Sequence, residues 1–263
     1  MPAIITDSMI TEWVAGFLWP LFRVAGFFMA VPLIGSQMLP SNMRLGLSVM
    51  TTLAIMPLLP PVPQIDLISM EAFLLIAQQV LIGVTFGFIV QIVYQVFALA
   101  GQIYAMQAGL GFASMADPAN GVNTTVMAQF LVIGGNMLFV TMNGHLALIQ
   151  ILADSFQLLP IGYVGVDREL FWEIASLGGW MFAAAFLIVL PGITALLMVQ
   201  AGLGIVTRAA PQLNIFSLGF PFMMTFSLLI AWIGLNTIVI HFESIFDFGL
   251  GFLRDWIESR AST

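Results

Sequence analysis

Few side chains in this sequence could do chemistry. It holds no cysteine, and its two histidines, His145 and His241, have no metal-ligating neighbour at a spacing that shares a helical face. Glu243 follows His241 by two residues, and residues two apart on a helix point to different faces. Neither a phosphate-binding loop nor an intramembrane-protease signature is present. These observations argue against a metal site, a bound cofactor and an enzyme.

Charged residues are rare, and this rarity indicates the class of protein. Only 7% of the residues are charged and 60% are hydrophobic, with thirteen acidic and six basic residues and a net charge of −7. All six basic residues are arginines, too few to cluster on phosphates, so nucleic acid is not expected as a partner. The composition predicts a membrane protein. No basic residue precedes Arg23, so we expect no cleavable signal peptide.

Isolated charges in apolar surroundings are candidate functional residues, because a charge in lipid is costly. They are Arg23, Arg44, Asp117, Asp154 and Arg208. Each could instead mark an interface boundary or pair with another subunit, and this reading is favoured for Arg44, Asp154 and Arg208. Asp117 lies in a glycine-rich loop, so both readings stay open there. A proton-relay transporter would need several intramembrane carboxylates, and the sequence offers almost none.

Long charge-free runs indicate the elements that must position these residues. Crossing about 30 Å of hydrocarbon takes about 20 apolar residues as a helix. With proline and glycine as breaks, we expect an all-α polytopic membrane protein with about six hydrophobic segments, near residues 10–31, 41–58, 70–100, 124–153, 174–206 and 213–242. The charged stretch 246–260 is expected to form a short amphipathic helix at a surface. No linker interrupts the chain, which predicts a single domain.

The charge-free run 72–116 is too long for a simple span. As one helix it would extend about 68 Å, so the chain either turns near Gly101 or leaves the bilayer as a long helix. Gln91, Gln95 and Gln102 share one face of such a helix. They would serve either helix–helix hydrogen bonds or a water-filled path.

Small residues recur every four positions at the end of this run and lead into an unusual loop. Gly101, Ala105, Gly109 and Ala113 would allow a neighbouring helix to approach closely. Residues 109–121 then combine three glycines, a proline and one carboxylate in apolar surroundings, as expected of a flexible loop buried inside an assembly. Several methionines lie near this loop, where they would fill a core or seal a conduit.

Five segments, in this order, resemble the FliR family of flagellar biosynthetic proteins, which are export-gate subunits of type III secretion systems. The segments are residues 23–35, 40–47, 109–118, 143–146 and 210–221, and the resemblance covers nearly the whole chain. It implies a place in the bacterial inner membrane at the base of the flagellum. There, one R-type subunit would complete a helical ring with P-type and Q-type subunits, joined by the B-type gate component, and unfolded export substrates would pass through.

The resemblance also implies an organisation and a set of site residues. Residues 1–179 would be P-type-like and residues 180–263 a Q-type-like helical hairpin, with long hairpins packing in a hetero-oligomeric gate. The loop plugging the closed channel would consist of Leu110, Gly111, Phe112, Ala113, Ser114, Met115 and Ala116, with Asp117, Pro118 and Gly121 shaping its turn. Met106 and Met115 are candidates for a methionine gasket. The residues assigned to subunit packing are Arg23, Arg44, Gly101, Ala105, Gly109, Arg208, Pro211, Gln212, Asn214 and Pro221.

Two other functions stay open at this point. A small-solute transporter would show an internal inverted repeat and polar residues on broken helices, and no convincing repeat is present. An architectural membrane scaffold differs from a gate subunit because changes in its loop would alter assembly and not conductance.

Overall fold

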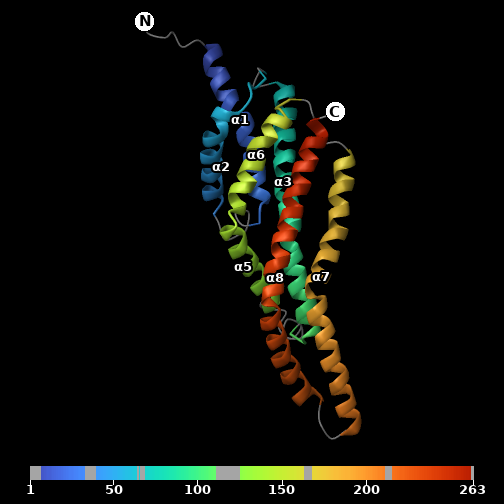
Figure 1. Cartoon of the computed structure of the whole chain (residues 1–263). Helices are drawn as coiled ribbons and strands as arrows, with labels where there is room; N and C mark the ends of the chain where they lie inside the picture. The colour runs from blue at the N-terminus through green and yellow to red at the C-terminus, as the bar shows by residue number, and fades with distance from the viewer. Residues whose placement is uncertain are drawn as a thin grey trace. The chain divides into compact units, whose positions relative to one another are not determined.

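The computed structural model describes residues 7–32, 40–63, 65, 69–110, 125–162, 168–210 and 215–261. Within these ranges the chain forms seven α-helices, one short 3₁₀ helix and no strand, which confirms the all-α prediction. The elements, labelled in Figure 1, are α1 (Asp7–Ala30), α2 (Ser41–Ile55), η1 (Met56–Leu58), α3 (Met70–Gln107), α5 (Val126–Thr141), α6 (Gly144–Leu158), α7 (Arg168–Ala209) and α8 (Ile215–Ala261).

Three of the helices are much longer than a membrane is thick. α3, α7 and α8 contain 38, 42 and 47 residues, or about 57, 63 and 70 Å at 1.5 Å per residue. Among the described residues, four helices are long and apolar enough to span a membrane, and five spans are possible if α5 and α6 together form one broken span. α2, with 15 residues, is too short. The chain is therefore a polytopic membrane protein, but the six predicted segments are not six spans.

α3 decides between the two alternatives predicted for the run 72–116, a turn near Gly101 or one long helix. The helix continues through Gly101 without a turn and ends at Gln107. The charged stretch 246–260 was predicted as a separate short helix, and this prediction is wrong, because it forms the last turns of α8. A change from apolar to charged residues does not break a helix, since the backbone hydrogen bonds continue regardless of which solvent the side chains meet.

The predicted segment 124–153 is two helices. α5 ends at Thr141 and α6 begins at Gly144. Between them Asn143 adopts the left-handed conformation with φ of 56°, the only positive φ of a non-glycine residue among those described. Asparagine tolerates this conformation better than most residues. The break therefore depends on a single asparagine and not on proline.

The chain forms two compact units, described here separately. The first contains residues 1–92, 143–175 and 248–263, and the second contains residues 93–142 and 176–247. Both units take parts of α3, α7 and α8. The sequence predicts a division between residues 179 and 180, into a P-type-like part and a Q-type-like part. The two compact units do not test this likeness, so the division stays a prediction.

In the first unit, α1 packs closely on the first half of α3. A Cβ built on Gly26 would lie 2.7 Å from the carbonyl oxygen of Val80, and one built on Gly87 would lie 2.8 Å from that of Phe27. The absence of side chains on these glycines lets the two backbones approach. Trp19 is buried in the same contact beside Leu75. Phe86 of α3 meets Trp256 of α8 edge to face, with ring centroids 5.3 Å apart.

The second unit has an aromatic core. Its rings come from the second half of α3, from α5 and from α8, with centroids between 4.7 and 6.4 Å apart: Tyr94, Phe97, Phe139, Phe242 and Phe246. Such contacts stabilise helix packing beyond the burial of apolar area. The end of α3 and the beginning of α5, which bracket the predicted plug, are thereby held in one unit.

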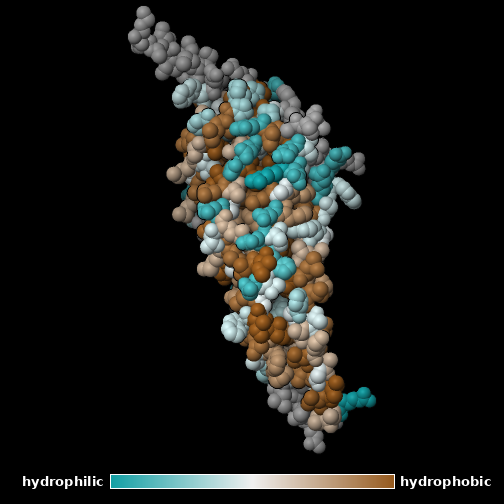
Figure 2. Space-filling view, in the orientation of Figure 1, coloured by the Kyte–Doolittle hydropathy of each residue, from teal (hydrophilic) through white to brown (hydrophobic). Residues whose placement is uncertain are grey.

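Much of the apolar surface of α7 and α8 stays exposed within the chain. In an 18-residue apolar window of each of the spans 171–209 and 219–259, only 28% and 11% of the residues are buried. Figure 2 shows apolar side chains over most of the visible face, with hydrophilic ones gathered over parts of α6 and the end of α8. Because a bilayer covers only about 20 residues of a helix, lipid cannot cover all of this surface.

Candidate functional site

The root of the predicted plug is the end of α3. Gly109 has φ of 81°, the Leu110 amide donates to the carbonyl of Ala105 at 2.9 Å, and the Gly109 amide donates to that of Met106 at 3.2 Å. This is a Schellman motif, which needs glycine at the left-handed position. Leu110 is half-buried. The remaining predicted plug residues, 111–118 and Gly121, lie outside the described residues, including Met115.

The helix α5, which follows residues 111–124, begins with an N-cap. Thr125 precedes α5, and its hydroxyl oxygen accepts a hydrogen bond from the Ala128 amide at 3.3 Å. This is an N-cap, which satisfies one of the free amides at the helix start. Residues 111–124 are therefore bounded by a Schellman motif before them and an N-cap after them, both in the second unit.

The small residues at the end of α3 occupy three different environments. Gly101 lies against the backbone of Met127 and Ala128 in α5, and Ala105 is completely buried. Gly109 lies beyond the helix, in the turn. The four-residue spacing thus marks close packing for the first two positions, here within the chain. Met106, a gasket candidate, is 73% exposed and is free to contact another molecule.

Two polar side chains near the root were not singled out as site residues from the sequence. The Tyr104 hydroxyl donates to the carbonyl oxygen of Ser227 in α8 at 2.6 Å, and both residues are buried. Gln107 Nε2 donates to Gln200 Oε1 in α7 at 2.9 Å, near the surface. A signal existed, because the hydroxyl of a buried tyrosine in an apolar helix usually finds an acceptor. The acceptor itself could not be predicted, since it lies 123 residues away.

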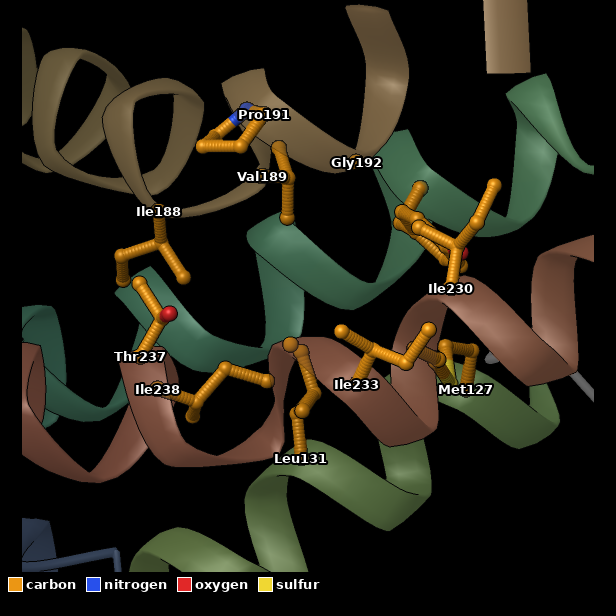
Figure 3. Close-up of a pocket in the computed structure, with 13 residues that line it drawn as sticks. Met127, Leu131, Ile188, Val189, Pro191, Gly192, Ile230, Ile233, Thr237 and Ile238 are labelled. Carbon is orange, nitrogen blue, oxygen red and sulfur yellow. The ribbon is translucent and has the colours of Figure 1, made fainter. Parts of the chain in front are cut away.

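Two apolar pockets lie beside these contacts in the second unit. The first, about 250 Å³, is lined by aliphatic residues of α5, α7 and α8, including Leu131, Ile188 and Ile230, with Tyr104 (Figure 3). The second, about 410 Å³, lies at the plug root between Met106, Gly204 and Phe220. Such linings suit apolar side chains or lipid tails, and they offer little to a hydrated ion.

Arg23 is the centre of a polar network in the first unit. It is completely buried. Its Nε donates to Gln79 Oε1 at 2.8 Å, and its terminal nitrogens donate to the carbonyls of Ser155 and Leu159 at 3.0 and 2.9 Å. Its guanidinium also lies 4.2 Å from the ring centre of Phe156. The arginine thus joins α1, α3 and α6, and it stabilises the carbonyl end of α6, where a cation is favoured.

The other predicted subunit-packing residues have varied positions. Arg208 and Pro221 are exposed on α7 and α8, and Arg44 is half-buried on α2. Pro211, Gln212 and Asn214 lie outside the described residues. The subunit-packing assignment of all these residues stays a prediction.

The glutamines of α3 divide between two roles. Gln79 is buried and bonded to Arg23. Gln95 is exposed, and Gln91 and Gln102 are half-buried. Helix–helix hydrogen bonding therefore holds for Gln79 and Gln107, while the face of Gln91, Gln95 and Gln102 remains open to a partner or to water.

The described residues show no metal-binding cluster. Among them, no group of three or more His, Cys, Asp or Glu side chains could hold a metal ion. The His241 ring contacts the carbonyl of Thr237 one turn earlier in the same helix at 2.8 Å, a local helix contact. What the arrangement around the plug root offers is apolar pockets, close helix contacts and two polar ties.

Comparison with known proteins places this arrangement in a family. The family model described as bacterial export proteins, family 1, matches residues 14–249. The flagellar biosynthetic protein FliR of Escherichia coli K12 is 37% identical over 221 residues, which are 84% of each chain. FliR of Pectobacterium carotovorum is 35% identical over 97% of each chain, and FliR of Buchnera aphidicola (strain APS) is 32% identical over 89% of this chain and 90% of that relative. These matches span both compact units, and the chain belongs to the FliR family of bacterial export proteins.

Proposed function

We propose that this chain is a non-enzymatic subunit of the flagellar type III protein export gate, helping to form and to plug the channel for unfolded flagellar proteins. The observation that carries this proposal is the match to flagellar export proteins along nearly the whole chain, residues 14–249. Such coverage means that both units, and the residues between α3 and α5, belong to the part of the chain shared with the family. The chain is a component of the export apparatus in the bacterial inner membrane.

The long helices support a role inside an assembly. α7 and α8 extend about 63 and 70 Å, and their apolar side chains are exposed far beyond what one bilayer can cover. Exposed apolar area of this extent marks a contact surface for lipid or protein. We infer that part of α7 and α8 is covered by other gate subunits.

The proposed partners are P-type and Q-type subunits and the B-type gate component, together with inner-membrane lipid. In this proposal residues 1–179 correspond to a P-type subunit and residues 180–263 to a Q-type hairpin. The channel contents are unfolded export substrates. An apolar closure suits this task, because it blocks ions by the cost of desolvating charge and still yields to a polypeptide.

The proposed plug is Leu110–Ala116, with Asp117, Pro118 and Gly121 shaping its turn and Met106 and Met115 contributing to a gasket. The described root supports this placement, because the Schellman motif at Gly109 ends α3 abruptly and releases the chain from the helix. The exposed Met106 lies at the same point.

Native mass spectrometry tests the assembly. The tagged chain is expressed alone and then together with P-type and Q-type subunits from the same bacterium. We expect a discrete complex that contains one copy of this chain. A stable monomer or homodimer that ignores these partners would overturn the proposal and favour a self-contained transporter.

Deletion of residues 110–116 tests the plug. We expect complexes that still assemble but allow ions to leak across the membrane. If the deletion abolishes assembly and conductance is unaffected in the complexes that remain, the chain acts as an architectural scaffold.

A further inference from the structure

The last two turns of α3 are tied to both α7 and α8 in the second unit. The hydroxyl of Tyr104 donates to the backbone carbonyl of Ser227 in α8, and the side-chain amide of Gln107 donates to the side-chain oxygen of Gln200 in α7. The Tyr104 bond is buried, and a buried polar group that loses its partner destabilises the structure. α3 therefore has a specific polar contact with each of these two helices, close to the point where it ends.

Besides the hydrogen bond of its hydroxyl to α8, the ring of Tyr104 packs closely against α7. A Cβ built on Gly192 of α7 would lie 2.8 Å from Cε2 of this ring. Gly192 follows Pro191, a proline inside α7, and both line the apolar pocket beside Tyr104 (Figure 3). A proline removes one backbone hydrogen bond from its helix and weakens it locally. The ring thus sits against a turn of α7 that a proline weakens.

The plug root follows these ties immediately along the chain. Gly109 takes the left-handed conformation two residues after Gln107, and a Cβ on it would lie 3.3 Å from the ring of Phe220 in α8. No flexible helical turn separates the ties from the root. A shift of α7 or α8 must therefore move the end of α3 or break these bonds.

We propose that Tyr104 and Gln107 are positioning residues that latch the root of the plug to α7 and α8, so that displacement of these two helices releases the plug. This proposal rests on the proposed function of residues 110–116. The exposed apolar faces of α7 and α8 provide the surface on which a neighbouring subunit exerts the displacement. Ordinary helix packing would instead leave the closed state unchanged when the two bonds are removed.

The chain supplies a matched control for the tyrosine. Tyr94 lies on the same helix in the same unit, and its hydroxyl is buried without a hydrogen-bond partner among the described residues. Tyr94→Phe removes a hydroxyl that makes no bond, whereas Tyr104→Phe removes one that holds α8. Gly192→Ala, which would push on the Tyr104 ring, has its control in Gly202→Ala, where the added methyl meets no described atom within 4 Å.

The first experiment measures ion leak through assembled gates in cells, with native mass spectrometry as the check on assembly. An average hydrogen bond in a membrane protein changes an equilibrium about threefold, so losing both bonds shifts the closed–open equilibrium by up to about ninefold. We expect Tyr104→Phe with Gln107→Leu to leak more than wild type, and Tyr94→Phe to match wild type. A double variant as ion-tight as wild type would overturn the latch.

The second experiment keeps the latch closed and does not depend on the leak assay. The chain has no cysteine, so Gln107→Cys with Gln200→Cys can be joined by a short bis(methanethiosulfonate) reagent. It forms a reducible disulfide with each thiol and releases methanesulfinate, and loss of free thiols measures the yield. Cross-linking should block export of flagellar proteins, and reduction should restore it. Export at the uncross-linked rate would overturn the latch, and each single-cysteine variant controls for modification alone.

These results separate the latch from the plug itself. If deletion of residues 110–116 leaks while the double variant stays tight and cross-linked gates export normally, the plug stands and the latch is overturned. If the deletion is also ion-tight, the plug assignment fails. If the double variant does not assemble, the cross-linking result alone decides.

Discussion

The close-packed glycines of α1 and α3 and most of the described glycines of α7 and α8 lie in opposite surroundings, with Gly192 of α7 as an exception. A Cβ on Gly26 would lie 2.7 Å from the carbonyl oxygen of Val80 in the neighbouring helix. A Cβ on Gly202 or Gly234 would meet no described atom within 4 Å. Glycine thus closes a contact inside the chain in the first case, and leaves a helix face open to another molecule in the second.

Polar groups follow the same division. The buried guanidinium of Arg23 has acceptors on α3 and α6 of its own unit. The faces of α7 and α8 are apolar and exposed, and Gln200 is the polar residue that α3 reaches on α7. The difference indicates that α1, α3 and α6 complete their contact within one chain. The exposed apolar faces of α7 and α8 must instead be covered by lipid or by another protein.

The strongest way to break this comparison is a large side chain at Gly83. Gly83→Leu would run into the backbone of Arg23 and Phe27, so we expect the free energy of unfolding to fall by about 3 kcal/mol. The measurement is thermal unfolding of the detergent-purified protein. Gly202→Leu is the matched control, and equal stability of the two variants would contradict the comparison.

The Arg23 network should contribute a smaller amount. Arg23→Met removes the donor to Gln79 Oε1 and to the carbonyls of Ser155 and Leu159, of which the Ser155 carbonyl keeps the Leu159 amide. We expect this loss to lower the free energy of unfolding by about 2 kcal/mol. Arg23→Lys should recover only part of this, because one ammonium group does not reproduce the forked geometry of a guanidinium. Denaturant titration measures both.

The exposed Arg254 controls for loss of charge in this series. Arg254→Met should change the free energy of unfolding by less than about 0.5 kcal/mol. If Arg23→Met is as mild as that, the buried network does not stabilise the first unit.

A large side chain on α7 should act on assembly and leave folding intact. Gly202→Leu is expected to unfold at the wild-type temperature, yet to weaken association with P-type and Q-type subunits by about tenfold, or about 1.4 kcal/mol. Co-purification at decreasing protein concentration measures this. Full recovery of the complex would mean that this face of α7 meets lipid.

The smallest expected effect is a difference in sign. Gly202→Ala should raise the free energy of unfolding by about 0.5 kcal/mol, because alanine loses less backbone entropy in a helix than glycine does. Gly83→Ala should lower it, since even a methyl group there meets the backbone of α1. A shared sign in thermal unfolding would remove the distinction between the two regions.

The sequence predicted most of the fold because its signals are local. Leu159-Pro160 and Ala210-Pro211 follow the ends of α6 and α7 as expected. Two predicted helix boundaries were wrong because the local signal was misleading or absent. The charged stretch after residue 246 stays helical within α8, and Asn143 breaks the run near residues 124–153 with neither proline nor glycine at the left-handed position.

The candidate site was only partly predictable. The glycine-rich loop and Gly109 were visible as a pattern, and Gly109 indeed ends α3 in a left-handed turn. The partners of Tyr104 and Gln107 were not, because Ser227 and Gln200 are 123 and 93 residues away along the chain. Contacts at such separations depend on which helix faces meet, and no single-sequence pattern specifies that.

Composition and spacing by themselves determined that this protein is an all-α membrane protein and that the run 72–116 is too long for a simple span, since apolar content and the absence of charge set the solvent that each segment tolerates. The order of its motifs determined the family. The tertiary structure alone decided that Arg23 is satisfied within its own chain, and that the Tyr104 hydroxyl bonds the end of α3 to α8. It also decided which glycines close an internal contact, because a residue type specifies what a helix face can accept, and only packing specifies what it meets.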